Sequence, residues 1–139
     1  MSTHWTVEHA VVTTADRSTA WAHWTDLRHH AELEPGIERI ELDGPFATGT
    51  RGRTIGRDFE QQWELRDVVP EERFVITGTA PGFSLSFAWT FEDDDGGRRM
   101  TQRISAEGPG LDAIRHELRG MEENAPSAMA RLAERLDRL

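Results

Sequence analysis

Three polar side chains have both the chemistry and the spacing to act inside an otherwise apolar interior: His9, Gln61 and Gln102. Each lies in a segment where large apolar residues alternate with other residues, and each falls on the apolar side. Because side chains of a strand point alternately to its two faces, this pattern predicts that all three face inward. There they would orient a mostly apolar ligand, or be buried groups satisfied by backbone or water. His9 is also a candidate catalytic acid or base, since an imidazole changes charge near neutral pH.

The densest group of titratable side chains lies within residues 23–34. It consists of His23, Asp26, His29, His30, Glu32 and Glu34. The histidines lack the H-E-x-x-H spacing that places two imidazoles on one helical face to hold a metal. A solvated helix and loop is therefore favoured, and no metal is expected.

Other charged residues share single strand faces. Arg51, Arg53 and Arg57 could clamp a carboxylate or phosphate, but a solvated face that offsets the abundant acids is favoured. Glu60 and Glu64 have the spacing of paired carboxylates, yet they fall opposite the large apolar residues of their segment. No dinucleotide or phosphate-binding glycine loop and no G-x-S-x-G motif occurs. No cofactor is expected.

An aromatic strand is the element best suited to position a ligand. Small or hydroxylated residues separate five large apolar side chains at every second position: Phe83, Leu85, Phe87, Trp89 and Phe91. This arrangement predicts one wholly apolar wall, which needs a covering layer. Residues 111–139 supply one, because their apolar residues recur at spacings of three and four, as in an amphipathic helix. Pro126 lies inside this helix and predicts a kink or a break near Asn124.

The remaining patterns place the other elements. Strands are expected at residues 3–13, 37–43, 48–57, 59–66, 73–79, 83–91 and 98–107, with short helices at about 17–27 and 28–34. Asp16 is the expected N-cap of the first helix, which carries Trp21 and Trp24 at helical spacing. The pattern does not assign an inward face to 73–79. Consecutive strands beside segregated helices predict an α+β fold with an antiparallel sheet, in a single domain over residues 1–139.

The composition narrows the partners. The formal net charge of −9 argues against nucleic acid and anionic membrane surfaces. No apolar run approaches the ~20 residues needed to cross a bilayer, and the start of the chain lacks the pattern of a signal peptide, so a cytoplasmic protein without membrane insertion is expected. The chain has no cysteine, which excludes thiol catalysis. The sequence leaves a monomer or a homodimer open.

The order of elements resembles the helix-grip fold of the START-like superfamily (SRPBCC), in particular its polyketide cyclase/dehydrase group. The resemblance is carried by Thr14-Ala15-Asp16 through Trp21, Leu33-Glu34-Pro35-Gly36-Ile37, Gly82-Phe83 through Trp89-Thr90-Phe91-Glu92, Gly96-Gly97-Arg98-Arg99-Met100-Thr101 and Gly108-Pro109. It implies a curved seven-stranded antiparallel sheet wrapped around a long C-terminal helix, with two short helices between strands 1 and 2. It also implies a cavity between sheet and helix, entered near the loop after the short helices.

The resemblance and the apolar wall together predict binding of a small hydrophobic ligand, aromatic, polyketide-like or lipid-like. The expected ligand-binding residues are His9, Trp24, His30, Gln61, Trp63, Phe87, Trp89, Gln102, Leu118 and Met121. The alternative is a polyketide cyclase or dehydratase that uses the same cavity, with His9 or His30 as the acid or base. A co-chaperone is a weaker alternative, because residues 47–52 lack the doubled glycine and aromatic typical of the Hsp90-activator group.

Overall fold

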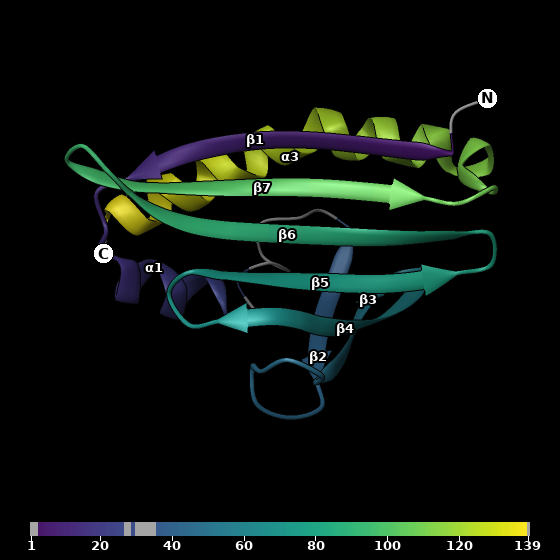
Figure 1. Cartoon of the computed structure of the whole chain (residues 1–139), viewed down its shortest axis with the longest axis horizontal. Coiled ribbons are helices and arrows are strands. Elements are labelled where there is room, and N and C mark those ends of the chain that lie inside the picture. Colours follow the sequence, from purple (N-terminus) through teal and green to yellow (C-terminus); the bar gives the residue numbers. More distant parts are fainter. Residues whose placement is uncertain (1–2, 27–28, 30–35, 139) are drawn as a thin grey trace.

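A computed structural model describes residues 3–26, 29 and 36–138 of the chain (Figure 1). Seven strands form one antiparallel sheet in the order β1-β7-β6-β5-β4-β3-β2. The strands are β1 (His4–Thr13), β2 (Ile37–Leu42), β3 (Arg51–Gly56), β4 (Glu60–Val69), β5 (Arg73–Ala80), β6 (Phe83–Asp94) and β7 (Gly97–Glu107). Helix α1 (Arg17–Trp24) follows β1, and a 3₁₀ turn, η1 (Leu111–Ile114), leads into the long helix α3 (Arg115–Asp137). The predicted α+β helix-grip fold is confirmed.

The alternation that predicted the inward faces is present in the structure. Along β1, the half-buried Trp5, Val7, His9 and Val11 are separated by exposed residues. On β7, which pairs with β1, every second residue from Met100 to Ala106 is buried. The sheet therefore has one apolar face, and α3 packs on that face mainly along β1. In Figure 1, α3 lies behind β1 and β7.

The expected strand boundaries shift where glycine allows a turn. The strand expected at 48–57 begins only at Arg51, because Gly49 turns the chain with a φ of 96°. The strand expected at 83–91 extends to Asp94, and the hairpin closes through Gly96 with a φ of 77°. The face of 73–79 that the pattern left unassigned is settled by Phe74, which is fully buried.

The helices are held by their ends and by their apolar faces. Asp16 caps α1 as predicted, since its carboxylate accepts a hydrogen bond from the backbone N–H of Thr19 at 2.8 Å. The predicted second short helix at 28–34 lies outside the described residues apart from His29. A kink or a break was expected near Asn124; helix α3 runs through Pro126, so a break there is wrong. The helix tolerates this proline because its ring is exposed and only one helical hydrogen bond is lost.

The C-terminal end of α3 is tied to the end of β1. A carboxylate oxygen of Asp137 accepts hydrogen bonds from the Thr13 hydroxyl at 2.6 Å and from the Thr14 backbone N–H at 2.8 Å. Thr13 is 1% exposed, so this contact joins the helix to the edge of the core. It fixes where the helix ends over the sheet.

The buried apolar residues form two clusters. The larger cluster includes Trp24, Trp63, Phe74 and Trp89, together with the C-terminal half of α3. The smaller cluster is built from Ala106, Leu111 and Leu118 and the side chains around them. The two clusters do not merge, so the packing of buried apolar side chains is not continuous between them.

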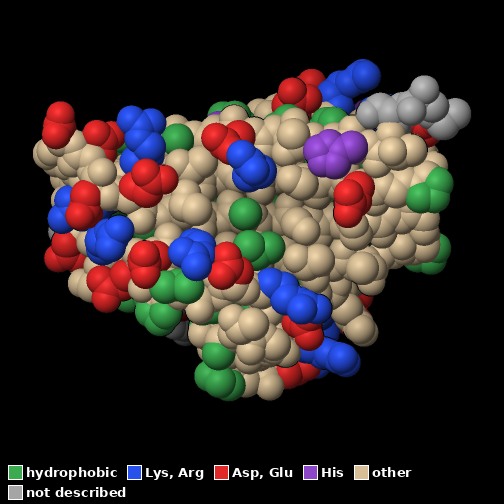
Figure 2. Space-filling view, viewed as in Figure 1, with side chains coloured by type: hydrophobic (Ala, Val, Ile, Leu, Met, Phe, Trp, Pro, Cys, Tyr) green, Lys and Arg blue, Asp and Glu red, His purple; other side chains and the backbone are tan. Residues whose placement is uncertain are grey.

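The outer face of the sheet is charged. Figure 2 shows arginine and acidic side chains interspersed over this face. Arg103 on β7 pairs with Glu8 on β1 at 2.9 Å, and Arg53 pairs with Glu41 at 2.6 Å. None of the helices in the described part of the chain is long and apolar enough to span a membrane.

Candidate ligand pocket

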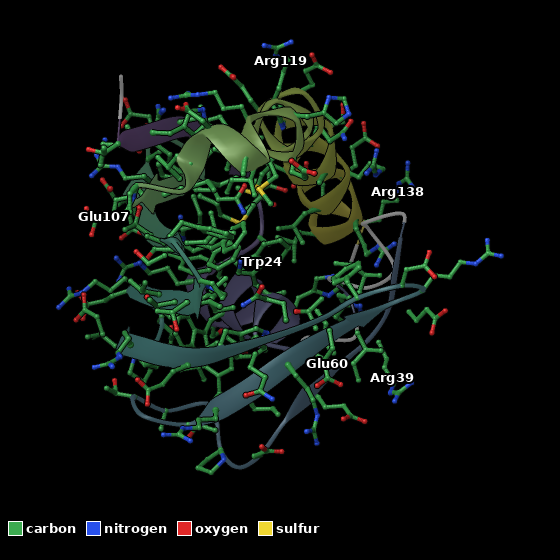
Figure 3. The ribbon with its side chains drawn as sticks, turned by 90° about the vertical axis from the view of Figure 1, so that its right-hand side faces the viewer. Trp24, Arg39, Glu60, Glu107, Arg119 and Arg138 are labelled. Atoms are coloured by element: carbon green, nitrogen blue, oxygen red, sulfur yellow. The ribbon has the colours of Figure 1, made fainter. Side chains whose placement is uncertain are left out.

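A pocket of about 640 Å³ lies between the apolar face of the sheet and the N-terminal half of α3. Its sheet side is formed by Ile37, Ile40, Thr54, Phe59, Gln61, Trp63, Ile76, Gly78, Phe83, Leu85, Phe87, Trp89, Gln102 and Ile104. Its helix side is formed by Ile114, Glu117, Leu118, Gly120, Met121, Asn124 and Ala125, and Gly36 completes the lining. Both apolar clusters contribute to this wall, so the pocket occupies the interruption between them. Figure 3 shows the curved sheet and α3 on two sides of the interior.

The structure brings together most of the residues that the sequence analysis predicted to bind a ligand. Those that line the pocket are Gln61, Trp63, Phe87, Trp89, Gln102, Leu118 and Met121. Two other predicted residues, Trp24 and His9, lie outside the lining. Trp24 packs edge-on against Trp89 at a centroid distance of 5.7 Å, and His9, on β1, pairs with Gln102 on the neighbouring strand β7. His30 lies outside the described residues.

The aromatic wall contains stacked rings. The rings of Phe87 and Trp89 are almost parallel, 16° apart, with centroids 6.0 Å apart. Trp89 also stacks on Phe74 at 4.8 Å. Phe83 and Leu85 continue the wall and are only half-buried, because they pack against the smaller cluster and also line the pocket. The wall therefore offers ring faces and alkyl groups to whatever occupies the space.

Glycines in the sheet make room for side chains that would otherwise fill the pocket. A β-carbon at Gly52 would lie 2.4 Å from the Trp63 indole, and one at Gly78 would lie 2.9 Å from the Gln61 amide nitrogen. These two glycine notches let both side chains lie down on neighbouring backbone. The indole is fixed there, since its Nε1–H donates to the Thr54 hydroxyl at 3.0 Å.

Polar groups on the sheet side are few and mostly engaged. The Gln61 amide donates to the carbonyl of Gln62 at 2.9 Å. Gln102, 6% exposed, stands in register with His9 on one side and Trp89 on the other. Burial lowers the pKa of His9 below its ordinary 6.5, and the contact with the Gln102 side chain offsets part of this effect. His9 is thus held as a neutral imidazole near pH 7.

Three polar or small residues of α3 line the pocket but were not predicted as ligand-binding residues: Glu117, Gly120 and Asn124. They lie three and four positions apart, so they form one stripe along the helix. Their spacing was available in the sequence. Because Glu117 and Asn124 are polar and exposed, however, the amphipathic pattern assigns them to solvent.

The histidine group outside the pocket forms a local contact. The rings of His23 and His29 stack at a centroid distance of 3.7 Å, and Nε2 of His29 lies 3.8 Å from a carboxylate oxygen of Asp26. Within the described ranges, no three His, Asp or Glu side chains come together as a metal site.

The curved antiparallel sheet, its long C-terminal helix and the pocket between them define a helix-grip protein of the START-like superfamily. Residues 4–139 match the family described as polyketide cyclase / dehydrase and lipid transport, and the chain belongs to this family. The comparison with curated proteins finds no match.

Solved structures share the fold at low sequence identity. The di-domain ARO/CYC StfQ from the steffimycin biosynthetic pathway aligns with a TM-score of 0.76 at 14% identity, over 97% of this chain and 51% of that chain. The chain therefore spans about half the length of StfQ. The Zhui aromatase/cyclase from Streptomyces sp. R1128 aligns with a TM-score of 0.75 at 19% identity, over 97% and 94%. Truncated norcoclaurine synthase from Thalictrum flavum aligns with a TM-score of 0.71 at 15% identity, over 96% and 92%.

Proposed function

We propose that the chain, acting as one domain over residues 1–139, binds a small, flat, largely apolar molecule in the pocket between the sheet and α3. The observation that carries this proposal is the pocket itself, about 640 Å³ within a chain of 139 residues. Pockets of roughly 300–1,000 Å³ accommodate molecules of two to four fused rings or of drug size. The glycine notches support the proposal, because they keep Trp63 and Gln61 against the sheet and out of the space.

The shape of the wall favours a ring system. The rings of Phe87 and Trp89 are nearly parallel and both line the pocket, so a planar ligand gains aromatic contact with them in addition to burial of its apolar surface. The polar groups that line the sheet side, chiefly the Gln61 and Gln102 amides, can orient such a ligand through the hydrogen-bonding capacity that their protein partners leave unused. The whole sheet side thus suits a polyketide-like or other polycyclic molecule.

Binding can be tested with 1-aminoanthracene, a neutral fluorescent molecule of three fused rings. We expect saturable quenching of tryptophan fluorescence, a rise in probe fluorescence and a higher melting temperature. Replacing Ile76, which lines the pocket, with tryptophan should abolish these changes because the indole fills the space. Thr79→Trp on the same strand is the control, since Thr79 is exposed and outside the lining. Saturable binding that survives in Ile76→Trp would contradict the proposal, as would no binding to the wild type.

The second candidate is a cyclase or dehydratase that acts on a poly-β-ketone held in the same pocket. It is favoured by the family and by His9, whose neutral imidazole contacts the pocket-lining Gln102. A cavity that holds a near-attack geometry needs few catalytic groups, since positioning supplies much of the rate. His9→Gln should then reduce cyclised product from a linear poly-β-ketone thioester while 1-aminoanthracene binding is retained. Unchanged product formation would remove His9 from the mechanism.

A further inference from the structure

Gly120 is a glycine in the interior of α3 for which the protein's own packing gives no reason. Glycine destabilises a helix interior relative to alanine, because it loses more backbone freedom on folding. A β-carbon built at Gly120 meets no protein atom within 4 Å, whereas one at Gly52 or Gly78 would overlap a neighbouring side chain. Gly120 lines the pocket, so the room that it leaves open belongs to the pocket.

Glu117 and Asn124 flank this bare backbone, about one helical turn to either side. Both line the pocket and are exposed. Among the described residues, no ion pair engages Glu117 and no side-chain hydrogen bond engages Asn124. We call Glu117, Gly120 and Asn124 the polar stripe. It offers a carboxylate, exposed helix backbone and an amide opposite a sheet side that is mostly apolar.

The charge of the polar stripe is negative. No arginine belongs to the described lining, and the chain has no lysine, because all sixteen basic residues of the sequence are arginine. Arg119, the neighbour of Gly120, points away from the sheet (Figure 3). Arg115, near the start of α3, pairs with Asp112 at 2.8 Å. The positive end of the α3 dipole is offset by Glu117 itself, which lies in the first turn.

We propose that the ligand rests directly on the α3 backbone at Gly120 and directs a hydrogen-bond donor, an amine or a hydroxyl, to Glu117 and Asn124. This inference rests on the proposed function and adds the ligand class: planar molecules with a donor at one edge, neutral or cationic. An anionic ligand of the same shape meets the Glu117 carboxylate, and no cation in the described part of the lining compensates this repulsion. Fatty acids and other carboxylates are thereby disfavoured.

The first arm of the test separates binding from folding at Gly120. Gly120→Ala should raise the melting temperature by roughly 2–4 °C, since alanine favours the helix. It should weaken 1-aminoanthracene binding by roughly tenfold or more, because a single methyl group in a filled site costs that much. Ser127→Ala, on the exposed side of α3, is the control and should leave affinity unchanged. Equal or tighter binding to Gly120→Ala overturns the contact with the backbone.

The second arm tests the sign of the charge with two probes of the same ring system. The wild type should bind 1-aminoanthracene about fivefold or more tighter than anthracene-1-carboxylate, and Glu117→Gln should narrow this preference. Glu122→Gln changes a residue of the same helix outside the lining, so it should leave the preference for 1-aminoanthracene unchanged. Equal affinity for both probes overturns the ligand class. In that case sensitivity of both probes to Ile76→Trp shows that the pocket still binds rings, so the proposed function stands. If neither probe binds, both proposals fail.

Discussion

Replacing Gly52 with alanine should force the Trp63 indole off the sheet. A β-carbon at Gly52 would lie 2.4 Å from Cη2 of Trp63 and 2.7 Å from Cζ2 and Cζ3. Carbon atoms in contact prefer roughly 3.5–4.0 Å, so the distal ring must retreat by roughly 1 Å. Since the indole lies between the sheet and the pocket, the retreat carries it into the space that a ligand would use.

The energetic cost follows from what holds the indole. Overpacking of this kind costs about 1–3 kcal/mol. Displacing Nε1 from the Thr54 hydroxyl, now 3.0 Å away, adds about 1 kcal/mol. Alanine returns about 0.4–1 kcal/mol by restricting the unfolded chain. The net loss of about 1–3 kcal/mol should lower the melting temperature of a chain of this size by roughly 3–15 °C, and 1-aminoanthracene should bind more weakly.

A double-mutant cycle with Trp63→Phe isolates this contact. The three atoms that a β-carbon at Gly52 would meet belong to the distal ring of the indole, which phenylalanine lacks. Gly52→Ala should therefore cost little in the Trp63→Phe background, giving a coupling free energy of about 1–3 kcal/mol from thermal or denaturant unfolding. Equal costs in the two backgrounds, or an unchanged melting temperature in Gly52→Ala, would show that the notch does not keep the indole down.

Two further changes test the anchor of α3 and the buried histidine. Asp137→Asn should lower the free energy of unfolding by about 1 kcal/mol near pH 7, against little change for Glu8→Gln, an exposed ion-pair residue. The Thr13 hydroxyl and Thr14 N–H lower the pKa of Asp137 below its ordinary 3.8, so the wild-type advantage should persist above that pH and vanish as pH falls through the lowered value. Equal stability of Asp137→Asn and wild type would count against the anchor. Because burial lowers the pKa of His9 below 6.5, the unfolded chain binds more protons and the wild type should lose stability as pH falls from about 6.5. His9→Gln should flatten this loss in unfolding measured between about pH 7 and 5; parallel pH curves would show that His9 is not the buried group responsible.

The sheet was predictable because its side chains alternate strictly. Phe83 to Phe91 place every large residue on one face, and the same period puts His9 and Gln102 inward. On β5 the period fails as a guide, since Val75 and Thr77 are β-branched on the outer face and Gly78 has no side chain on the inner one.

The pocket was predictable in outline but not in its helix side. Periodicity tells which face of an element is buried, but it does not tell whether that face meets side chains or open space. Trp24 was therefore expected on the pocket wall and instead packs against Trp89. In the sequence, Glu117 and Asn124 have the pattern of solvent-facing residues. They lie at the pocket because of the way α3 is oriented over the sheet, which periodicity does not predict.

Pro126 separates two parts of α3 that have different neighbours. The helix residues that line the pocket all precede it, ending at Ala125, whereas Met129 and Leu136 in the larger cluster follow it. Pro126 has no backbone N–H, so the Glu122 carbonyl accepts no helical hydrogen bond. The turn around Pro126 is therefore easier to bend than the rest of the helix. A ligand too thick for the pocket would therefore bend the helix at this turn first, while the contacts of Met129 and Leu136 with the larger cluster stay in place.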